Sequence, residues 1–166
     1  MRLFRLIIVS FLCIDSLVSF AQINDGIVNI QGVYTKKFPG NIPVNDKGKL
    51  LFGGADTLIT IYAETSGKGP EWTMAWWGGK NYSIISMLIL QTPYEAGTNA
   101  RDEKKIILNP ANGNKLWRLS LQSGEKKIDL PQKIKPGQLL LKAKYLDKTI
   151  FRKIDSLVQL TTFPSV

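Results

Sequence analysis

Three short apolar runs between Thr57 and Gln91 constrain the fold of this chain more than any other feature. Each run is rich in β-branched and aromatic residues, and glycine-rich segments separate them at 67–70 and 78–81. Such runs, divided by glycine and proline, are typical of strands joined by turns. The stretch therefore predicts a three-stranded antiparallel meander, with strands at 58–64, 71–77 and 82–90.

Alternation along these runs predicts which side chains share a face. The second run places Trp72 and Trp76 on one face and Trp77 on the other. Because tryptophans are mostly buried, we expect the first pair to fill the core. The third run is apolar at both alternating positions, which predicts a central strand covered on both faces.

Further short strands are expected on both sides of the meander, at 27–35, 49–52, 106–108, 115–121, 138–146 and 149–160. The last of these also fits helical spacing, but the short strands upstream favour a closing strand. Gly32 predicts a bulge in the first strand. Residues 22–26 are expected to form a loose leader, and residues 91–105 a polar loop.

The last hairpin carries a resemblance at the level of the fold. Pro136-Gly137 precedes a run in which Leu139, Leu141, Ala143 and Tyr145 alternate with Lys142 and Lys144, and Asp147-Lys148 then makes a turn. This resembles the end of many immunoglobulin-like secreted domains, and no motif specific to one family accompanies it. We therefore expect an all-β fold, a single immunoglobulin-like β-sandwich of about seven to nine antiparallel strands in residues 22–166.

The N-terminus has the features of a secretory signal peptide. Arg2 and Arg5 precede an apolar stretch, and small residues stand at the two positions that a signal peptidase reads before cleavage after Ala21. The apolar stretch is shorter than the ~20 residues of a spanning helix, and Asp15 interrupts it, so an uncleaved anchor is the less favoured alternative. We expect signal residues 1–21, no transmembrane segment after cleavage, and export to the periplasm, the cell surface or the medium, in a bacterium.

Two scarcities restrict the chemistry of the chain. It has no histidine, and its one cysteine, Cys13, lies in the expected signal segment. Histidine-dependent catalysis, thiol nucleophiles, disulfides and zinc–thiolate sites are thereby excluded from the exported part. We expect no catalytic residues, no metal and no cofactor. A hydrolase using Glu64 and Glu71, which would flank one hairpin turn, is a third-ranked alternative.

The formal net charge is +9, and basic residues are concentrated toward the C-terminus. A basic face can attract polyanions, and Lys142 and Lys144 are the candidates on the strand expected at 138–146. Lysine far outnumbers arginine, whereas bidentate phosphate recognition favours arginine. Nucleic acid is therefore not the expected partner, and a solvated lysine surface is the favoured interpretation.

The turn after the second strand supplies the remaining binding candidates, Trp77, Lys80 and Tyr82. Exposed aromatic rings at a strand end suit stacking on sugars or other apolar ligands. The sequence thus predicts an exported, non-catalytic binding or assembly module for a protein or glycan partner. A carbohydrate-binding module using the Trp77–Tyr82 rim is the alternative.

Overall fold

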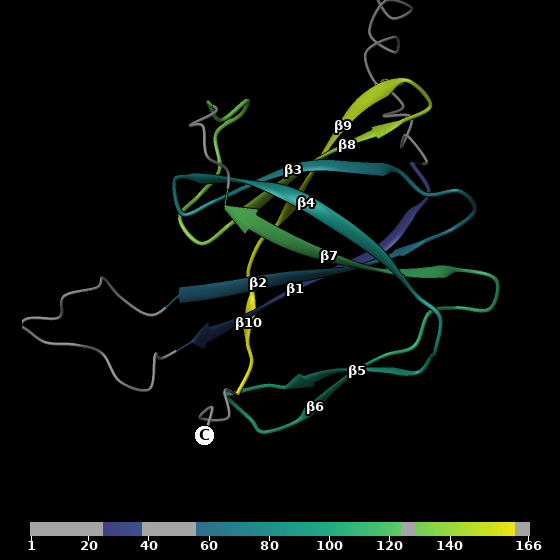
Figure 1. Cartoon of the computed structure of the whole chain (residues 1–166), viewed down its shortest axis with the longest axis vertical. Coiled ribbons are helices and arrows are strands. Elements are labelled where there is room, and N and C mark those ends of the chain that lie inside the picture. The colour runs from purple at the N-terminus through teal and green to yellow at the C-terminus, as the bar shows by residue number, and fades with distance from the viewer. Residues whose placement is uncertain (1–24, 38–55, 124–128, 162–166) are drawn as a thin grey trace, which may run out of the picture.

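A curled β-sheet makes up most of the part of the chain that the structure describes (Figure 1). The structure is a computed structural model, and it describes residues 25–37, 56–123 and 129–161. Within these ranges there are ten strands and no helix. They are β1 (Ile27–Lys37), β2 (Asp56–Thr65), β3 (Glu71–Trp77), β4 (Lys80–Ile89), β5 (Tyr94–Thr98), β6 (Lys105–Leu108), β7 (Lys115–Ser123), β8 (Leu139–Tyr145), β9 (Lys148–Ile154) and β10 (Val158–Gln159). The predicted all-β class is confirmed.

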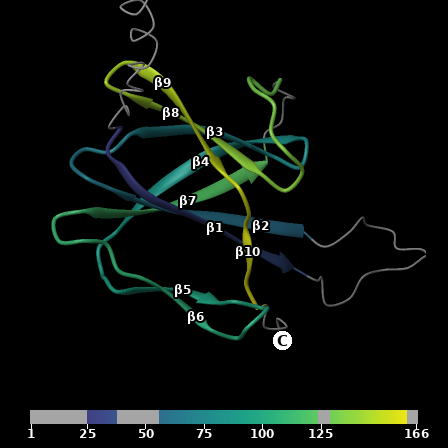
Figure 2. The ribbon, with the colours of Figure 1, turned by 180° about the vertical axis from the view of Figure 1, so that it is seen from behind.

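Among the described residues, eight strands pair into one sheet in the order β10-β1-β2-β7-β4-β3-β8-β9. Every neighbouring pair is antiparallel except β1 and β10, which run parallel. The remaining strands, β5 and β6, form a separate hairpin. Figures 1 and 2 show the sheet curling, so that the segment from β9 to β10 passes across β1.

The inner face of the curled sheet holds the main core. Its buried side chains come from five strands, because alternate residues of each strand point inward. Burying each Leu or Ile contributes roughly 1.5–3 kcal/mol, so this cluster is the main source of stability. Its buried members are Ile59, Ile61, Ala63, Trp72, Ala75, Leu119, Leu121, Leu139, Leu141, Ala143 and Ile154.

The β5–β6 hairpin covers part of the outer face and makes a second cluster there. Tyr62 lies between inward-facing Ile61 and Ala63, so its ring points outward, and it is buried. Side chains of the hairpin, including Tyr94, pack against it. In Figure 1 the hairpin lies below the eight-stranded sheet. Part of the outer face is thus shielded from solvent, as the inner face is.

Close approach, and no bulge, explains the glycine in β1. Gly32 pairs regularly with Ile61, and the irregularity of β1 lies earlier, between Ile27 and Asn29. A Cβ atom on Gly32 would collide with the side chain of Leu157. The predicted bulge at Gly32 is therefore wrong. The glycine instead lets the segment after β9 pack onto β1.

The predicted meander is half right. β3 and β4 pair as a hairpin, but β2 pairs with β1 and β7 and not with β3. β7 inserts between β2 and β4, and β8 takes the other edge of β3. The turn residues at 67–70 are local signals, and they carry no information about the insertion of β7, which lies much later in the chain.

The predicted faces of the second run are also wrong. A register shift between Trp72 and Met74 changes the alternation of β3. Trp72 and Ala75 therefore both enter the main core, while Trp76 is buried on the opposite face. Trp77 is half-buried against the main core, on the same side as Ala75.

Several boundaries differ from expectation. The strand predicted at 149–160 is a strand and not a helix, but it divides into β9 and β10. The expected loop at 91–105 contains β5, and the expected loose leader ends in the buried residues Asp25 and Gly26. The short strand at 49–52 and the signal segment lie outside the described residues. The described ranges contain no helix long and apolar enough to cross a membrane.

The number of strands also differs from expectation. The described residues form ten strands, whereas seven to nine antiparallel strands were expected, and one pair of them is parallel. The immunoglobulin-like arrangement stays a prediction.

Candidate functional site

The turn between β3 and β4 positions the aromatic candidates. Gly78 and Gly79 have φ values of 57° and 75°, which suits a two-residue hairpin turn that needs left-handed residues at both positions. Trp77 and Lys80 face each other across this turn. Lys80 is exposed, whereas Trp77 and Tyr82 are half-buried and pack against the main core. Burial raises the pKa of the Tyr82 hydroxyl.

The lysine candidates lie on β8. The Nζ of Lys144 is 3.3 Å from Oδ1 of Asp147, and Glu71 of β3 faces Lys144 across the strands. Lys142 lies between Met74 of β3 and Phe151 of β9. Acidic neighbours therefore offset the charge of Lys144, while Lys142 has apolar neighbours on both sides.

The structure does not join the two groups of candidates into one site. Ala75 of β3 pairs with Leu141 of β8, and both side chains point into the main core. Trp77 is two residues from Ala75 on β3 and therefore points to the same, inner face. Lys142 is the neighbour of Leu141 on β8 and therefore points to the outer face. The aromatic rim and the lysine face thus lie on opposite faces of the sheet.

An exposed apolar surface on the outer face was missed by the sequence prediction. On β4, Ile85 is 49% exposed and Met87 is 61% exposed, although β4 lies in the middle of the sheet between β7 and β3. Met87 faces Arg118 of β7 across the strands. We call Ile85, Met87 and Arg118 the open face. The expectation that this strand is covered on both faces is wrong, because the hairpin cover does not extend over Ile85 and Met87.

One signal in the sequence could have indicated the open face. The partner strand β7 alternates cleanly, with Leu119 and Leu121 directed inward and with Arg118 and Ser120 on the other parity. A strand with polar residues on one face does not have that face in a core. The pairing of β4 with β7 was required to use this signal, and the sequence does not show that pairing.

Arg118 lies at the border between the covered and the open parts of the outer face. Tyr62 of β2 faces it on one side, and Met87 of β4 on the other. The rings of Tyr62 and Tyr94 lie 5.6 Å apart at 48°. Burial, then the hydrogen bond with Tyr94, raises the pKa of Tyr62, and the nearby Arg118 charge opposes this shift. The Nε atom of Arg118 is buried and has no hydrogen-bond partner in the described part of the chain.

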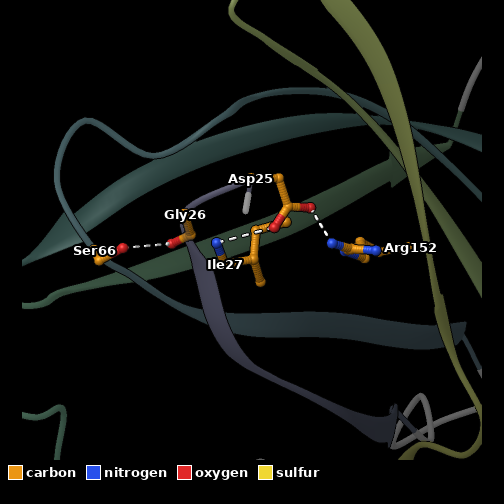
Figure 3. A network of polar contacts seen from close by, with 5 residues as sticks. All are labelled: Asp25, Gly26, Ile27, Ser66 and Arg152. Atoms are coloured by element: carbon orange, nitrogen blue, oxygen red, sulfur yellow. Dashed lines mark hydrogen bonds and ion pairs between the residues drawn. The ribbon is translucent and has the colours of Figure 1, made fainter. Parts of the chain in front are cut away.

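A buried ion pair secures the start of β1 (Figure 3). The carboxylate of Asp25 pairs through Oδ2 with the guanidinium of Arg152 in β9, and its Oδ1 accepts a bond from the Ile27 N–H at 3.2 Å. The side chain of Asp25 is 3% exposed. The Ser66 N–H donates to the Gly26 carbonyl oxygen at 2.8 Å. These contacts connect β1, the end of β2 and β9, which identifies the network as a structural clasp.

The carboxylates considered for catalysis occupy separate positions. Oε1 of Glu64 accepts bonds from the Ala111 N–H, at 2.9 Å, and from the Asn114 amide. Glu71 lies on β3, and β7 and β4 separate its strand from that of Glu64. The hairpin that would have brought the two together does not form. Within the described ranges, no group of three or more Asp, Glu, Cys or His residues is arranged to hold a metal ion.

Comparison of this chain with models of protein families, with curated proteins and with solved structures finds no match. The site is therefore interpreted from its own geometry.

Proposed function

We propose that the chain is an exported, non-catalytic binding or assembly module that engages a partner through the open face. The observation that carries this proposal is the exposure of Ile85 and Met87 on a central strand. Exposed apolar side chains that are neighbours on one face mark interaction surfaces in many soluble proteins. A central strand offers a rigid platform, because β7 and β3 fix it on both sides.

Export and the finer fold belong to the same proposal. The expected signal segment supports a periplasmic, surface or secreted location. The immunoglobulin-like arrangement is supported by the enclosed core, since the inner faces of a curled sheet pack as the layers of a sandwich do. Edman sequencing of the protein recovered outside the cytoplasm should begin at Gln22. A product that retains residue 1 would contradict cleavage.

Cross-linking from defined positions tests the binding role. A photoreactive amino acid replaces Met87 in the open face or, as a matched control, Ile107, which is 51% exposed on β6. Ile107 lies between Ile106 and Leu108, which pack on the second cluster, so it points away from the sheet. We expect discrete protein adducts from position 87 in the producing cells and none from position 107. Equal yields from both positions would contradict a specific surface.

The aromatic rim supports carbohydrate binding as a second candidate. Trp77 and Tyr82 lie at the end of one hairpin and are each partly exposed beside Lys80. Both rings are half-buried, so they offer less free ring area than a flat stacking platform, next to one cation. A glycan array probed with wild type and Trp77→Ala tests it, and absence of binding by both proteins would reject it.

A further inference from the structure

We infer that the open face takes a partner protein segment that combines apolar side chains with a carboxylate, and that Arg118 pairs with this carboxylate. The inference rests on the proposed function and adds the chemistry of the partner. Three observations support it. Ile85 and Met87 are exposed, Arg118 has no carboxylate partner among the described residues, and the chain has a positive net charge.

Ile85 and Met87 supply the apolar part of the contact. They are two residues apart on β4, so both project from the same face. Ser83 and Ser120 are small neighbours on that face, which leaves the two apolar side chains prominent. Methionine adapts to the shape of a partner, which suits a docking surface. Polyanions such as nucleic acids and acidic glycans have no comparable apolar side chains, so this part of the surface favours a protein.

Arg118 supplies the polar part. Among the described residues it makes no ion pair with a carboxylate. Glu64, which projects from the same face of β2, directs Oε1 to the turn at 111–114. A half-buried guanidinium beside apolar side chains binds a carboxylate more strongly than a fully hydrated one does, and its planar donors fit carboxylate oxygens. The Arg118 side chain, half-buried and without a carboxylate partner among the described residues, is therefore placed to pair with a carboxylate of a partner segment.

The charge of the chain argues against a second copy as the partner. The full chain carries a formal net charge of +9, and removal of Arg2, Arg5 and Asp15 with the expected signal segment leaves 20 basic and 12 acidic residues, a net charge of +8. A two-fold contact centred on this face would also bring two Arg118 side chains together, because such an interface pairs a patch with itself. Like charges next to each other in a contact are unfavourable. An acidic partner avoids both kinds of repulsion, because its charge is opposite to that of the chain and to that of Arg118.

A random library of displayed 12-residue peptides tests the partner chemistry on the exported chain. We expect enriched peptides to carry apolar residues together with at least one Asp or Glu. Synthetic versions should bind wild type at least tenfold more tightly than they bind Ile85→Asp or Arg118→Gln. The matched control is Ile107→Asp, since Ile107 is 51% exposed and Ile85 is 49% exposed. It should bind like wild type, and all variants should show the wild-type far-UV circular dichroism.

The outcomes separate the inference from the proposed function. Peptides that lose binding in Ile85→Asp but bind Arg118→Gln as tightly as wild type would leave the binding surface in place and overturn the acidic partner. Binding that is unchanged in Ile85→Asp, or no enrichment at all, would overturn both. A dimer seen by sedimentation that Ile85→Asp dissociates would make a second copy the partner and would also overturn the inference.

Discussion

The two faces of the strands β4 and β7 differ in what they contact. On the inner face, Leu119 and Leu121 are buried among residues of five strands. On the outer face, Leu116 is covered by the β5–β6 hairpin, while Ile85 and Met87 are exposed. Apolar surface that stays exposed to water adds no burial energy to the fold. The comparison indicates that the inner face and the part of the outer face under the hairpin stabilise the fold, whereas Ile85 and Met87 contribute less because they stay partly exposed.

The largest expected effect comes from the inner face. Leu119→Ala removes a fully buried side chain from the middle of the core. It should lower the free energy of unfolding by about 2–5 kcal/mol, because the loss of burial adds to the cost of a cavity. Urea unfolding of the purified chain measures this. A loss of less than about 1 kcal/mol would contradict the enclosed core, and Met87→Ala is the outer-face control.

The clasp at the start of β1 should have the next largest effect. Arg152→Ala leaves the Asp25 carboxylate buried without its partner, so the unfolding free energy should fall by about 2–3 kcal/mol. Asp25→Ala should cost less, since the Arg152 side chain is 42% exposed and can be hydrated. A double-mutant cycle with both changes measures the coupling. Additive effects would show that the two side chains do not interact.

The covered part of the outer face should give stability a dependence on alkaline pH. Burial and the Tyr94 bond raise the pKa of Tyr62 above its ordinary value near 10. As pH rises past 10, the unfolded chain releases this proton while the folded chain keeps it, so stability falls. Tyr62→Phe should cost about 1 kcal/mol at neutral pH and should weaken the alkaline loss. If Tyr62→Phe lost stability at alkaline pH as steeply as wild type, a group other than Tyr62 would be responsible for that loss.

The open face should give the smallest effect on stability. Ile85→Asp changes a residue that is 49% exposed, and the unfolding free energy should fall by about 1 kcal/mol or less, because only half of the side chain is buried and Asp is disfavoured in strands. The same denaturation measurement applies. A loss of 2 kcal/mol or more would show that the side chain contributes to the fold, and the open face would then lose its interpretation as a free surface.

The sequence was sufficient to predict where several strands and turns lie, and insufficient to predict which strands pair. The β-branched runs and glycine turns identify β2, β3 and β4 and the β3–β4 hairpin, since these signals act over a few residues. The insertion of β7 between β2 and β4 depends on packing across the whole chain. Without that pairing, neither the separation of Glu64 from Glu71 nor the position of Arg118 beside Met87 can be deduced.

Local irregularity limited the prediction of the site in a different way. The register shift after Trp72 reverses the faces of the residues that follow it, so alternation places Trp76 on the wrong side. The sequence also did not predict that Asp25 is buried. Its partner in the ion pair, Arg152, is far away in the sequence, so no local pattern indicates the contact. A one-residue irregularity and a long-range ion pair leave no periodic signal in a sequence.

Solvent access to the Met87 methyl group tests the open face most directly. Methyl-labelled methionine gives separate NMR signals for Met74 and Met87, which are half-buried and 61% exposed. A soluble paramagnetic agent should broaden the Met87 signal much more than the Met74 signal in the purified chain without a partner. A Met87 signal as protected as that of Met74 would show that the outer face of β4 is already covered, and would contradict an open binding surface.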